Sequence, residues 1–221
     1  RLAETSKDLV IGGTAAIQVK NAAEGVLADV QREAKQGKPS TYQPGDGSVQ
    51  ISDAFRHVRI EDGECDIELL PSADGSCCVE YSNCGSIHHE CFVRDETPFI
   101  RSVDERRWFE KIGRRTRQMR VSLYMPATGY ETLFIATASG DINISEGFAF
   151  LNAELKTASG DVKLNVYAEE TLLVHSSSGN IAATVSGPGK VQADTMSGDV
   201  RLAGITDEGD VAAESKSGDI K

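Results

Sequence analysis

The residues best suited to chemistry in this sequence gather in a short stretch rich in cysteine and histidine. Its members are Cys77, Cys78, Cys84, His88, His89 and Cys91. Thiolate and imidazole groups at short spacing are ligands that hold zinc in proteins. The stretch lacks the paired Cys-x-x-Cys knuckles of a zinc finger, however, and alternating side chains on a strand point to opposite faces. We therefore predict ordinary strands here, with no metal and no cofactor, and with Cys65 and Cys77 facing the core.

A basic segment with embedded aromatic residues runs from Arg101 to Arg120. It holds 8 basic and 3 acidic residues, a local charge of +5 in a chain of net charge −11. Basic and aromatic side chains together can contact phosphates or glycans. A solvated excursion between two strands would explain the segment equally well. If the protein has a partner-contact surface here, its residues are Arg106, Arg107, Trp108, Phe109, Arg114, Arg115 and Arg117.

Carboxylates in the last part of the chain form a third group. Paired carboxylates serve the chemistry of polysaccharide lyases and hydrolases, and the available ones are Asp194, Asp207, Glu208 and Asp210. Their scatter is that of any acidic surface, and no Gly-x-Ser-x-Gly, His-Glu-x-x-His or Walker pattern occurs. We therefore expect no catalytic residues and no enzymatic activity, with a polysaccharide-active enzyme as the alternative.

The triplet Ser-Gly-Asp, or Ser-Gly-Asn, occurs five times in the second half of the chain. The spacings between successive triplets are 20, 19, 19 and 20 residues. Apolar residues stand six and four positions before each serine and again three positions after it, and this alternation predicts strands with one buried face. Glycine tolerates positive φ, so each triplet predicts a tight turn. The turn residues are Gly140, Asp141, Gly160, Asp161, Gly179, Asn180, Gly198, Asp199, Gly218 and Asp219.

The aspartates of these turns have two interpretations. Glycine- and aspartate-rich turns bind calcium in some β-rolls, so a column of aspartates could bind cations. Solvated carboxylates about 4.8 Å apart repel by only about 1 kcal/mol, so the column needs no metal. Asn180 also interrupts it, and no Gly-Gly-x-Gly-x-Asp pattern occurs. We therefore interpret the column as turn chemistry.

The repeats predict an all-β fold. Stacking them at about 4.8 Å joins their backbone hydrogen bonds and makes the buried columns continuous. The predicted architecture is a single-stranded β-helix, or β-solenoid, with coils of about 19–20 residues. The coils should be regular over residues 130–221 and irregular over residues 51–129. Leu133, Ile135, Ile142 and Ile144 should point inward, together with their equivalents in later repeats.

The first 50 residues have a different pattern. Asn21 and Glu24 have the spacing of a capping box, and Gly37 with Pro39 supplies a stop. These signals predict a short helical segment near residues 22–36. The polar stretch from Lys38 to Ser48 is typical of a linker. Residues 1–50 would thus form an N-terminal segment, and residues 51–221 the solenoid.

Composition narrows the classes of protein to consider. The chain has 221 residues, with 23 Lys and Arg against 34 Asp and Glu and a pI near 4.9. This acidic balance argues against nucleic acid as a partner. No run of 18 apolar residues is present to span a bilayer. Because the chain opens at Arg1, we expect an upstream segment that anchors an extracytoplasmic protein to the membrane, with a cytoplasmic location left open.

Several motifs occur together over roughly residues 53–221. They are Phe55 to Leu70 followed by Pro71-Ser72-Ala73-Asp74-Gly75, Val103 to Phe109, Leu123 to Pro126 with Tyr130 to Leu133, and the Ser-Gly-Asp turns. Together they resemble the bacterial adhesin β-helix family called domain of unknown function four-zero-nine-seven. The resemblance implies a β-solenoid, often carried behind an N-terminal membrane helix on the cell envelope, and it transfers no catalytic residues. It does not account for the early helix or the cysteine cluster.

These observations predict a non-catalytic envelope module, adhesin-like or scaffolding, whose flat faces present side chains to a partner. The partner is unknown; an envelope polymer, a glycan or a protein would fit, and nucleic acid would not. Self-assembly into a homo-oligomer through the solenoid ends is a further alternative, because an open strand edge at Ile220 invites pairing with a second copy.

Overall fold

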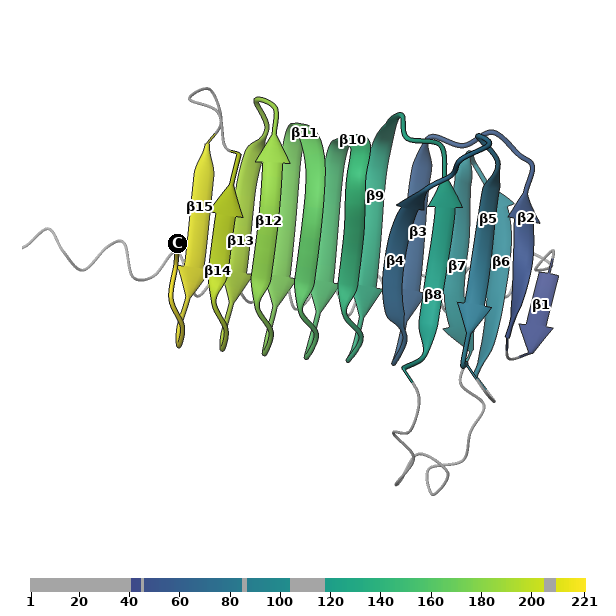
Figure 1. Ribbon diagram of the computed structural model, residues 1–221, viewed down its shortest axis with the longest axis horizontal. Coiled ribbons are helices and arrows are strands. Elements are labelled where there is room, and N and C mark those ends of the chain that lie inside the picture. Colours follow the sequence, from purple (N-terminus) through teal and green to yellow (C-terminus); the bar gives the residue numbers. More distant parts are fainter. Residues whose placement is uncertain (1–40, 45, 85–86, 104–117, 205–209) are drawn as a thin grey trace, which may run out of the picture. The chain divides into compact units, whose positions relative to one another are not determined.

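The computed structural model describes residues 41–44, 46–84, 87–103, 118–204 and 210–221. The helix predicted near residues 22–36 lies outside them. Within them the fold is all-β, a single mixed sheet of fifteen strands (Figure 1). No helix with the length and hydropathy needed to cross a membrane is found in this part of the chain. The strands are β1 (Thr41–Pro44), β2 (Gly47–Ile51), β3 (His57–Asp62), β4 (Asp66–Pro71), β5 (Cys77–Ser82), β6 (His88–Arg94), β7 (Thr97–Val103), β8 (Arg120–Met125), β9 (Gly129–Thr137), β10 (Ile142–Thr157), β11 (Val162–Ser176), β12 (Ile181–Ser186), β13 (Lys190–Thr195), β14 (Val200–Ala203) and β15 (Val211–Ser215).

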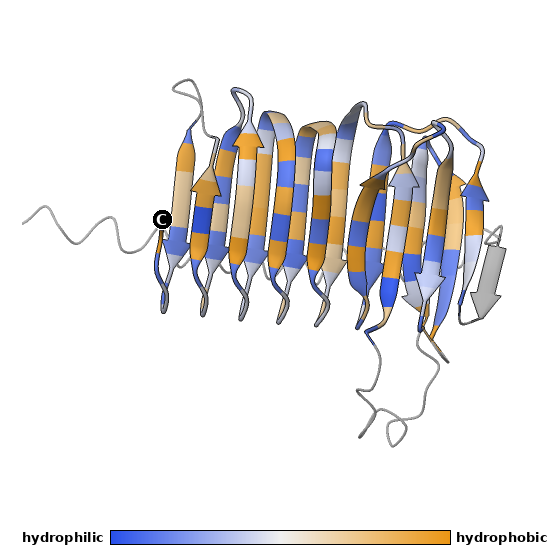
Figure 2. Ribbon diagram, in the orientation of Figure 1, coloured by the Kyte–Doolittle hydropathy of each residue, from blue (hydrophilic) through white to orange (hydrophobic). Residues whose placement is uncertain are grey.

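The sheet has two rows of strands, because β10 and β11 each bend and belong to both. The first part of β10 pairs with β4 and its last part with β9, while β11 pairs with β12 and then with β13. One row follows the order β2-β5-β8-β4-β10-β11-β12-β14, and the other follows β1-β6-β7-β3-β9-β10-β11-β13-β15. Alternate side chains of both rows are buried in one apolar cluster. Figure 2 shows this alternation as orange and blue bands along each strand.

Each parallel pairing in the second half joins residues that are one repeat apart. Ile142 pairs with Val162, Val162 with Ile181, and Ile181 with Val200. The offsets are 20, 19 and 19 residues, which are the spacings of the triplets. Equivalent residues therefore lie side by side, as the repeat predicted.

The predicted inward columns are confirmed for the first three repeats and for most of the fourth, in which Leu202 is half-buried. Leu133, Ile135 and Ile142 are at most 2% exposed, and so are most of their equivalents. In the last repeat Val211 and Ile220 are 42% and 51% exposed. Val211 lies in β15, which pairs with β13 at the end of one row, and Ile220 pairs with Val200 at the end of the other. No further strand of the described residues covers the outer side of either residue.

The first half departs from the predicted irregular coils. β5 pairs antiparallel with β2 and β8, and β6 pairs antiparallel with β1 and β7. The two residues between β6 and β7 are Asp95 and Glu96, whose φ values of 48° and 55° give the turn type that matches the twist of a hairpin. The prediction of coils over 51–129 is wrong for these strands, because a hairpin turn without glycine gave no signal in the sequence.

The expected linker also contains strands. β1 and the first residues of β2 fall between Lys38 and Ser48, and β2 pairs with β5 while burying Val49 and Ile51. Strand pairing uses backbone donors and acceptors, which every non-proline residue supplies. The polar composition therefore did not exclude a strand, and the linker prediction is corrected here.

Candidate functional site

The side chains of the turn column hold neighbouring turns together. Asp141 Oδ1 accepts the backbone N–H of Asp161 at 2.8 Å, and Asp161 Oδ1 accepts that of Asn180 at 2.7 Å. Asn180 Oδ1 accepts from Asp199 at 2.9 Å, and Asp199 Oδ1 from Asp219 at 3.1 Å. Asn180 therefore continues the column, because an amide oxygen accepts the same bond as a carboxylate oxygen. These contacts support a structural role for the column.

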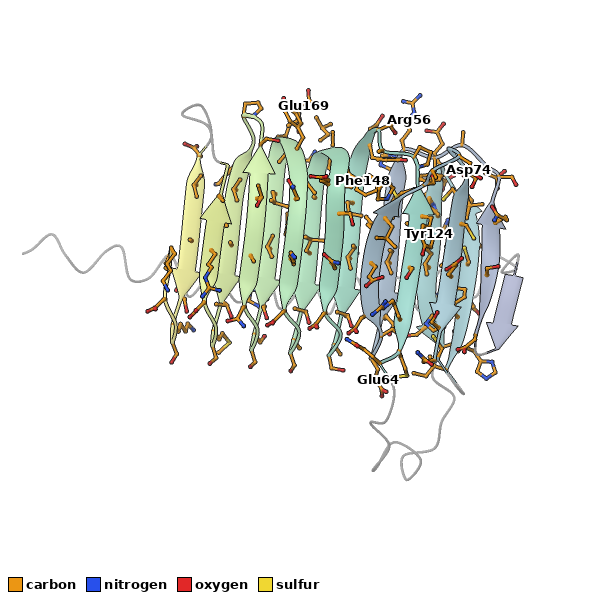
Figure 3. The ribbon with its side chains drawn as sticks, in the orientation of Figure 1. Arg56, Glu64, Asp74, Tyr124, Phe148 and Glu169 are labelled. Atoms are coloured by element: carbon orange, nitrogen blue, oxygen red, sulfur yellow. The ribbon has the colours of Figure 1, made fainter. Side chains whose placement is uncertain are left out.

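The column begins one turn earlier than the triplets indicated. Asp66 Oδ1 accepts the backbone N–H of Asp141 at 3.0 Å. Glu64, which precedes this first turn, lies along the same lower edge as the later turns (Figure 3). A signal was present in the sequence, since Asp66 precedes Ile67 as Asp141 precedes Ile142. It was missed because no Ser-Gly pair stands before Asp66.

A buried hydroxyl completes each turn. Thr157 Oγ1 donates to the carbonyl oxygen of Gly140 at 3.2 Å and accepts the N–H of Gly160 at 3.0 Å. The same bond to the glycine of the preceding turn is donated by Ser176, Thr195 and Ser215. The position two residues before each triplet serine is therefore Thr or Ser because a carbonyl group of the preceding turn accepts a hydrogen bond from this hydroxyl.

The triplet glycines are required for a different reason from the one predicted. Positive φ occurs at Gly75, Gly147, Gly187 and Gly204, none of which belongs to a triplet. The triplet turns are present, but their glycines do not use the tolerance of positive φ from which the turns were predicted. The triplet glycines instead lie against the backbone of the preceding turn, where a Cβ atom has no room.

The predicted contact surface is described only at its edges. The residues outside the described part are Arg106, Arg107, Trp108, Phe109, Arg114, Arg115 and Arg117. Of the flanking arginines, Arg101 donates from Nε to Glu90 at 2.6 Å, and the Nε of Arg120 lies 3.4 Å from a carboxylate oxygen of Glu68. Each flanking charge is thus paired with a glutamate of a neighbouring strand.

A row of aromatic and basic side chains crosses the outer surface of β6, β7, β3 and β9. We call Phe92, Phe99, Arg59 and Phe134 the aromatic row, since they are successive partners in the strand register. The rings of Phe92 and Phe99 stack at 5.1 Å, and the Arg59 guanidinium lies 4.5 Å from the centre of the Phe134 ring. All four are half-buried. The row could not be predicted from the sequence, because it joins segments that are far apart in the chain.

The carboxylates considered for an enzyme do not form a pair where they are described. Asp207 and Glu208 lie outside the described residues. Asp194 of β13 pairs with Glu214 of β15. Asp210 directly precedes Val211, whose partner on β13 is Val191. Asp194 and Asp210 are thus about four residues, or about 13 Å, apart along the strands. The carboxylates of a glycosidase lie within about 10 Å of each other.

A buried Asp–His pair joins the end of β3 to β6, the two strands on either side of β7. Asp62, the last residue of β3, accepts the backbone N–H groups of Glu64 and Cys65 through Oδ1 at 2.8 and 2.7 Å. Its other oxygen, Oδ2, lies 2.8 Å from His89 Nε2, and both side chains are at most 1% exposed. Burial by itself raises the pKa of Asp62, but the hydrogen bonds from His89 and the two backbone amides hold it below its ordinary value.

Two cysteines adjoin this pair. Cys65 Sγ lies 3.8 Å from His89 Nε2. The sulfurs of Cys65 and Cys84 and a ring nitrogen of His89 all lie within 4.8 Å of one another, and all three residues are buried. A hydrogen bond between the thiols raises the pKa of Cys65 and lowers that of Cys84. The ring of Tyr81 stacks on His89 at 4.6 Å.

The cysteine-rich stretch was predicted to form strands with Cys65 and Cys77 in the core. Both cysteines are buried, and the stretch forms β5 and β6, but Cys84 lies in the loop that follows β5. None of the five cysteines of the chain, Cys65 included, is in a disulfide. What the sequence did not indicate is that Cys84 and His89 come together with Cys65, from a different segment. The turn after β3 and the loop after β5 are brought together only by the pairing of β5 and β6 with their neighbours.

The described residues thus define a repetitive all-β protein, in which parallel strands stack one repeat apart and polar turn residues join the repeats. Residues 55–221 match the model of the family Toastrack DUF4097, and the chain belongs to this family. The family resemblance drawn from the motifs is therefore confirmed.

Several solved structures are similar to this chain. A "putative adhesin" from Bacteroides fragilis is 16% identical, over 82% of this chain and 97% of that chain, with a TM-score of 0.41. A "putative cell adhesion protein" from Clostridium sporogenes is 9% identical, over 80% and 98% of the two chains, with a TM-score of 0.36. A "putative lipid binding protein" from Parabacteroides distasonis is 11% identical, over 80% and 97%, with a TM-score of 0.28. No curated protein matches the chain.

Proposed function

We propose that this protein is a non-catalytic interaction module of the bacterial cell envelope, adhesin-like or scaffolding, that binds an extended glycan chain on its outer surface. Its stacked repeats would form a β-solenoid, exposed outside the cytoplasm and carried on the membrane. Membership of the Toastrack DUF4097 family supports this proposal, because the resemblance to that family implied an envelope β-solenoid without catalytic residues.

The register of both rows supports the solenoid. In the second row Leu133 pairs with Ala153, Ala153 with Leu172, and Leu172 with Val191. These offsets of 20, 19 and 19 residues equal the offsets in the first row, so every repeat advances the chain by one strand in each row. A solenoid coil has this property, and it gives the outer faces a regular, rigid surface.

The aromatic row is the observation that carries the proposed function. Aromatic rings provide a large contact area at low cost in conformational entropy, and together with arginine they are the side chains that dominate binding at interfaces. The row is also close to neutral, because Arg59 pairs with Glu61, and Arg101, whose guanidinium lies over the ring of Phe92, pairs with Glu90. A neutral aromatic surface on an acidic protein favours a glycan, whose sugar faces stack on rings, over a polyanion.

Three observations support a non-catalytic role. The Asp62–His89 pair, which resembles part of a catalytic triad, has side chains at most 1% exposed, so a polymer has no access to it. Asp194 and Asp210 are too far apart along their strands for the mechanisms of glycosidases. The turn carboxylates that could bind substrate or cations accept backbone hydrogen bonds from the next turn.

The test is a sedimentation assay with insoluble cell-wall glycans. Wild-type protein, the double variant Phe99→Ala/Phe134→Ala and the control Tyr167→Ala should be compared on the same panel. Tyr167 is an exposed aromatic residue on the other row of strands, 42% accessible to solvent. We expect the double variant to bind about tenfold more weakly and the control to bind as wild type does. Equal binding by the double variant, or no binding by any of the three, would contradict the proposal, and release of soluble sugars would contradict the non-catalytic role.

A further inference from the structure

We propose that Cys65, Cys84, His89 and Asp62 form a structural site for one Zn²⁺ ion. This inference is independent of the proposed glycan binding. It replaces the expectation of no metal that the spacing of the cysteine-rich stretch gave, because the ligands come from two segments that the sequence does not show to be neighbours.

The distances between the ligand atoms are those of a nearly formed tetrahedral site. With Zn–S bonds of about 2.3 Å and Zn–N bonds of about 2.0–2.1 Å, tetrahedral zinc holds a sulfur and a nitrogen ligand about 3.6 Å apart and two sulfurs about 3.8 Å apart. Cys65 Sγ is 3.8 Å from His89 Nε2. No two of the three ligand atoms of Cys65, Cys84 and His89 are farther apart than 4.8 Å. Small side-chain rotations therefore bring them onto one ion.

Asp62 is oriented to supply the fourth ligand. Its Oδ1 accepts two backbone N–H groups, from Glu64 and Cys65, which fixes the plane of the carboxylate. This leaves Oδ2 directed at the ring of His89, 2.8 Å from Nε2. Oδ2 would be the fourth ligand of an ion bound by Nε2 once the side chains close around the ion, because Asp62 lies outside the group of three residues whose ligand atoms are within 4.8 Å of one another. Two thiolates, one imidazole and one carboxylate then complete a four-coordinate site of the ligand types that zinc prefers.

The burial of all four side chains indicates a structural site, and it explains why a cation would stabilise the fold there. Cys65 and Cys84 are 0% and 1% exposed, and the side chains of His89 and Asp62 are equally buried. A closed site of four protein ligands has no open position for a substrate. A buried carboxylate and thiolate are costly without a compensating cation, which Zn²⁺ supplies. On binding, the two thiols lose their protons to solvent, and the ion takes the place of the hydrogen bond between His89 and Asp62.

The position of the site agrees with such a role. Cys65 lies in the turn between β3 and β4, Cys84 follows β5, and His89 lies in β6. Cys84 and His89 belong to the antiparallel strands β5 and β6 and the loop between them, whereas Cys65 lies in the first turn of the Asp and Asn column, next to Asp66. Zinc would there join this first turn to the antiparallel strands beyond it, which the hydrogen-bonded column does not reach.

The test measures zinc in the full chain purified under reducing conditions. Wild type and the control Cys78→Ser should contain one zinc per chain, whereas Cys84→Ser and His89→Gln should each contain less than about a tenth of that amount. Cys78 is a half-buried cysteine of the same stretch whose sulfur is outside the cluster. Substitution with Co²⁺ should give thiolate-to-cobalt absorption in wild type and the control, and about half that intensity or less in Cys84→Ser.

A measurement on wild type alone guards against variants that do not fold. Removal of the metal with a chelator should lower the melting temperature, and added Zn²⁺, but not Mg²⁺, should restore it. Absence of zinc with no change in melting temperature on adding Zn²⁺ would overturn the proposal. So would full zinc content in both Cys84→Ser and His89→Gln, or a disulfide between Cys65 and Cys84 in freshly purified protein, seen as a loss of two mass units.

Discussion

The point at which a Cβ atom of Gly160 would lie is 1.9 Å from the carbonyl oxygen of Gly140. The same close approach recurs along the column, at 2.0 Å for Gly179, 2.2 Å for Gly198 and 2.0 Å for Gly218, each to the glycine of the preceding turn. Successive turns therefore touch backbone to backbone. The repeat allows no side chain at this position, whatever the φ of the residue.

Substitution of one such glycine should be severe. Gly160→Ala would force two turns apart and break the hydrogen bonds between them, so we expect the free energy of unfolding to fall by at least about 3 kcal/mol, measured by urea denaturation. Gly129→Ala is the matched control, because a Cβ atom there meets nothing within 4 Å, and it should change stability by no more than about 0.5 kcal/mol. Equal losses in the two variants would show that the turns are not in contact.

The buried hydroxyl of each turn should contribute through its hydrogen bonds rather than its volume. Thr157→Val keeps the shape of the side chain but leaves the carbonyl of Gly140 and the N–H of Gly160 without this partner. We expect a loss of about 1–3 kcal/mol in the free energy of unfolding. Thr184→Val, at an exposed position of β12, should cost little. If Thr157→Val leaves the free energy of unfolding unchanged, other groups must form hydrogen bonds with the carbonyl of Gly140 and the N–H of Gly160.

Neighbouring residues on β11 should respond oppositely to a charge. Leu164 is 2% exposed and Lys163 is exposed. Leu164→Asp would bury an unpaired carboxylate between repeats and should lower the free energy of unfolding by about 3–5 kcal/mol. Lys163→Asp should have a small effect in the same assay. A melting temperature of Leu164→Asp close to that of wild type would contradict the packing between the two rows.

Asp194 should make stability depend on pH. Burial raises its pKa in the folded protein, against the opposing effects of Gln192 and His175. A raised pKa means that this group favours folding when protonated, and that this contribution is lost as the pH rises through the raised pKa. Asp194→Asn should therefore match wild type in acid and become the more stable of the two towards pH 7. Urea denaturation across this range, with exposed Asp210→Asn as the control, would reveal the growing difference in the free energy of unfolding; a constant difference between Asp194→Asn and wild type would contradict the prediction.

The regular repeats could be predicted because local pattern and tertiary contact coincide there. Ile142 and Val162 are partners in the sheet and also occupy the same position of successive repeats, so a spacing in the sequence is a contact in space. The structural role of the turn aspartates was predicted from the same regularity. The reason that each triplet needs a glycine could not be predicted, because the close approach of two turns exists only in the stack and not within a single turn.

The candidate sites could not be predicted because they depend on pairings with no repeat. His89 reaches Asp62 only after β6 and β7 form a hairpin, and its turn at Asp95 and Glu96 lacks glycine. The aromatic row likewise joins residues whose sequence separations follow no period. In such regions the register of a strand is set by tertiary packing, and the sequence alone leaves it open.

The central claim is that the Asp and Asn column joins the turns through backbone hydrogen bonds and leaves recognition to the outer surface. The most direct measurement is the free energy of unfolding of Asp161→Asn and Asp161→Ala, each with calcium and with a chelator. Asparagine keeps the oxygen that accepts the N–H of Asn180, so Asp161→Asn should lie within about 0.5 kcal/mol of wild type, while Asp161→Ala should lose about 1–2 kcal/mol, both independently of calcium. An Asp161→Asn variant as unstable as Asp161→Ala, with calcium stabilising only wild type, would show instead that the column is a cation site.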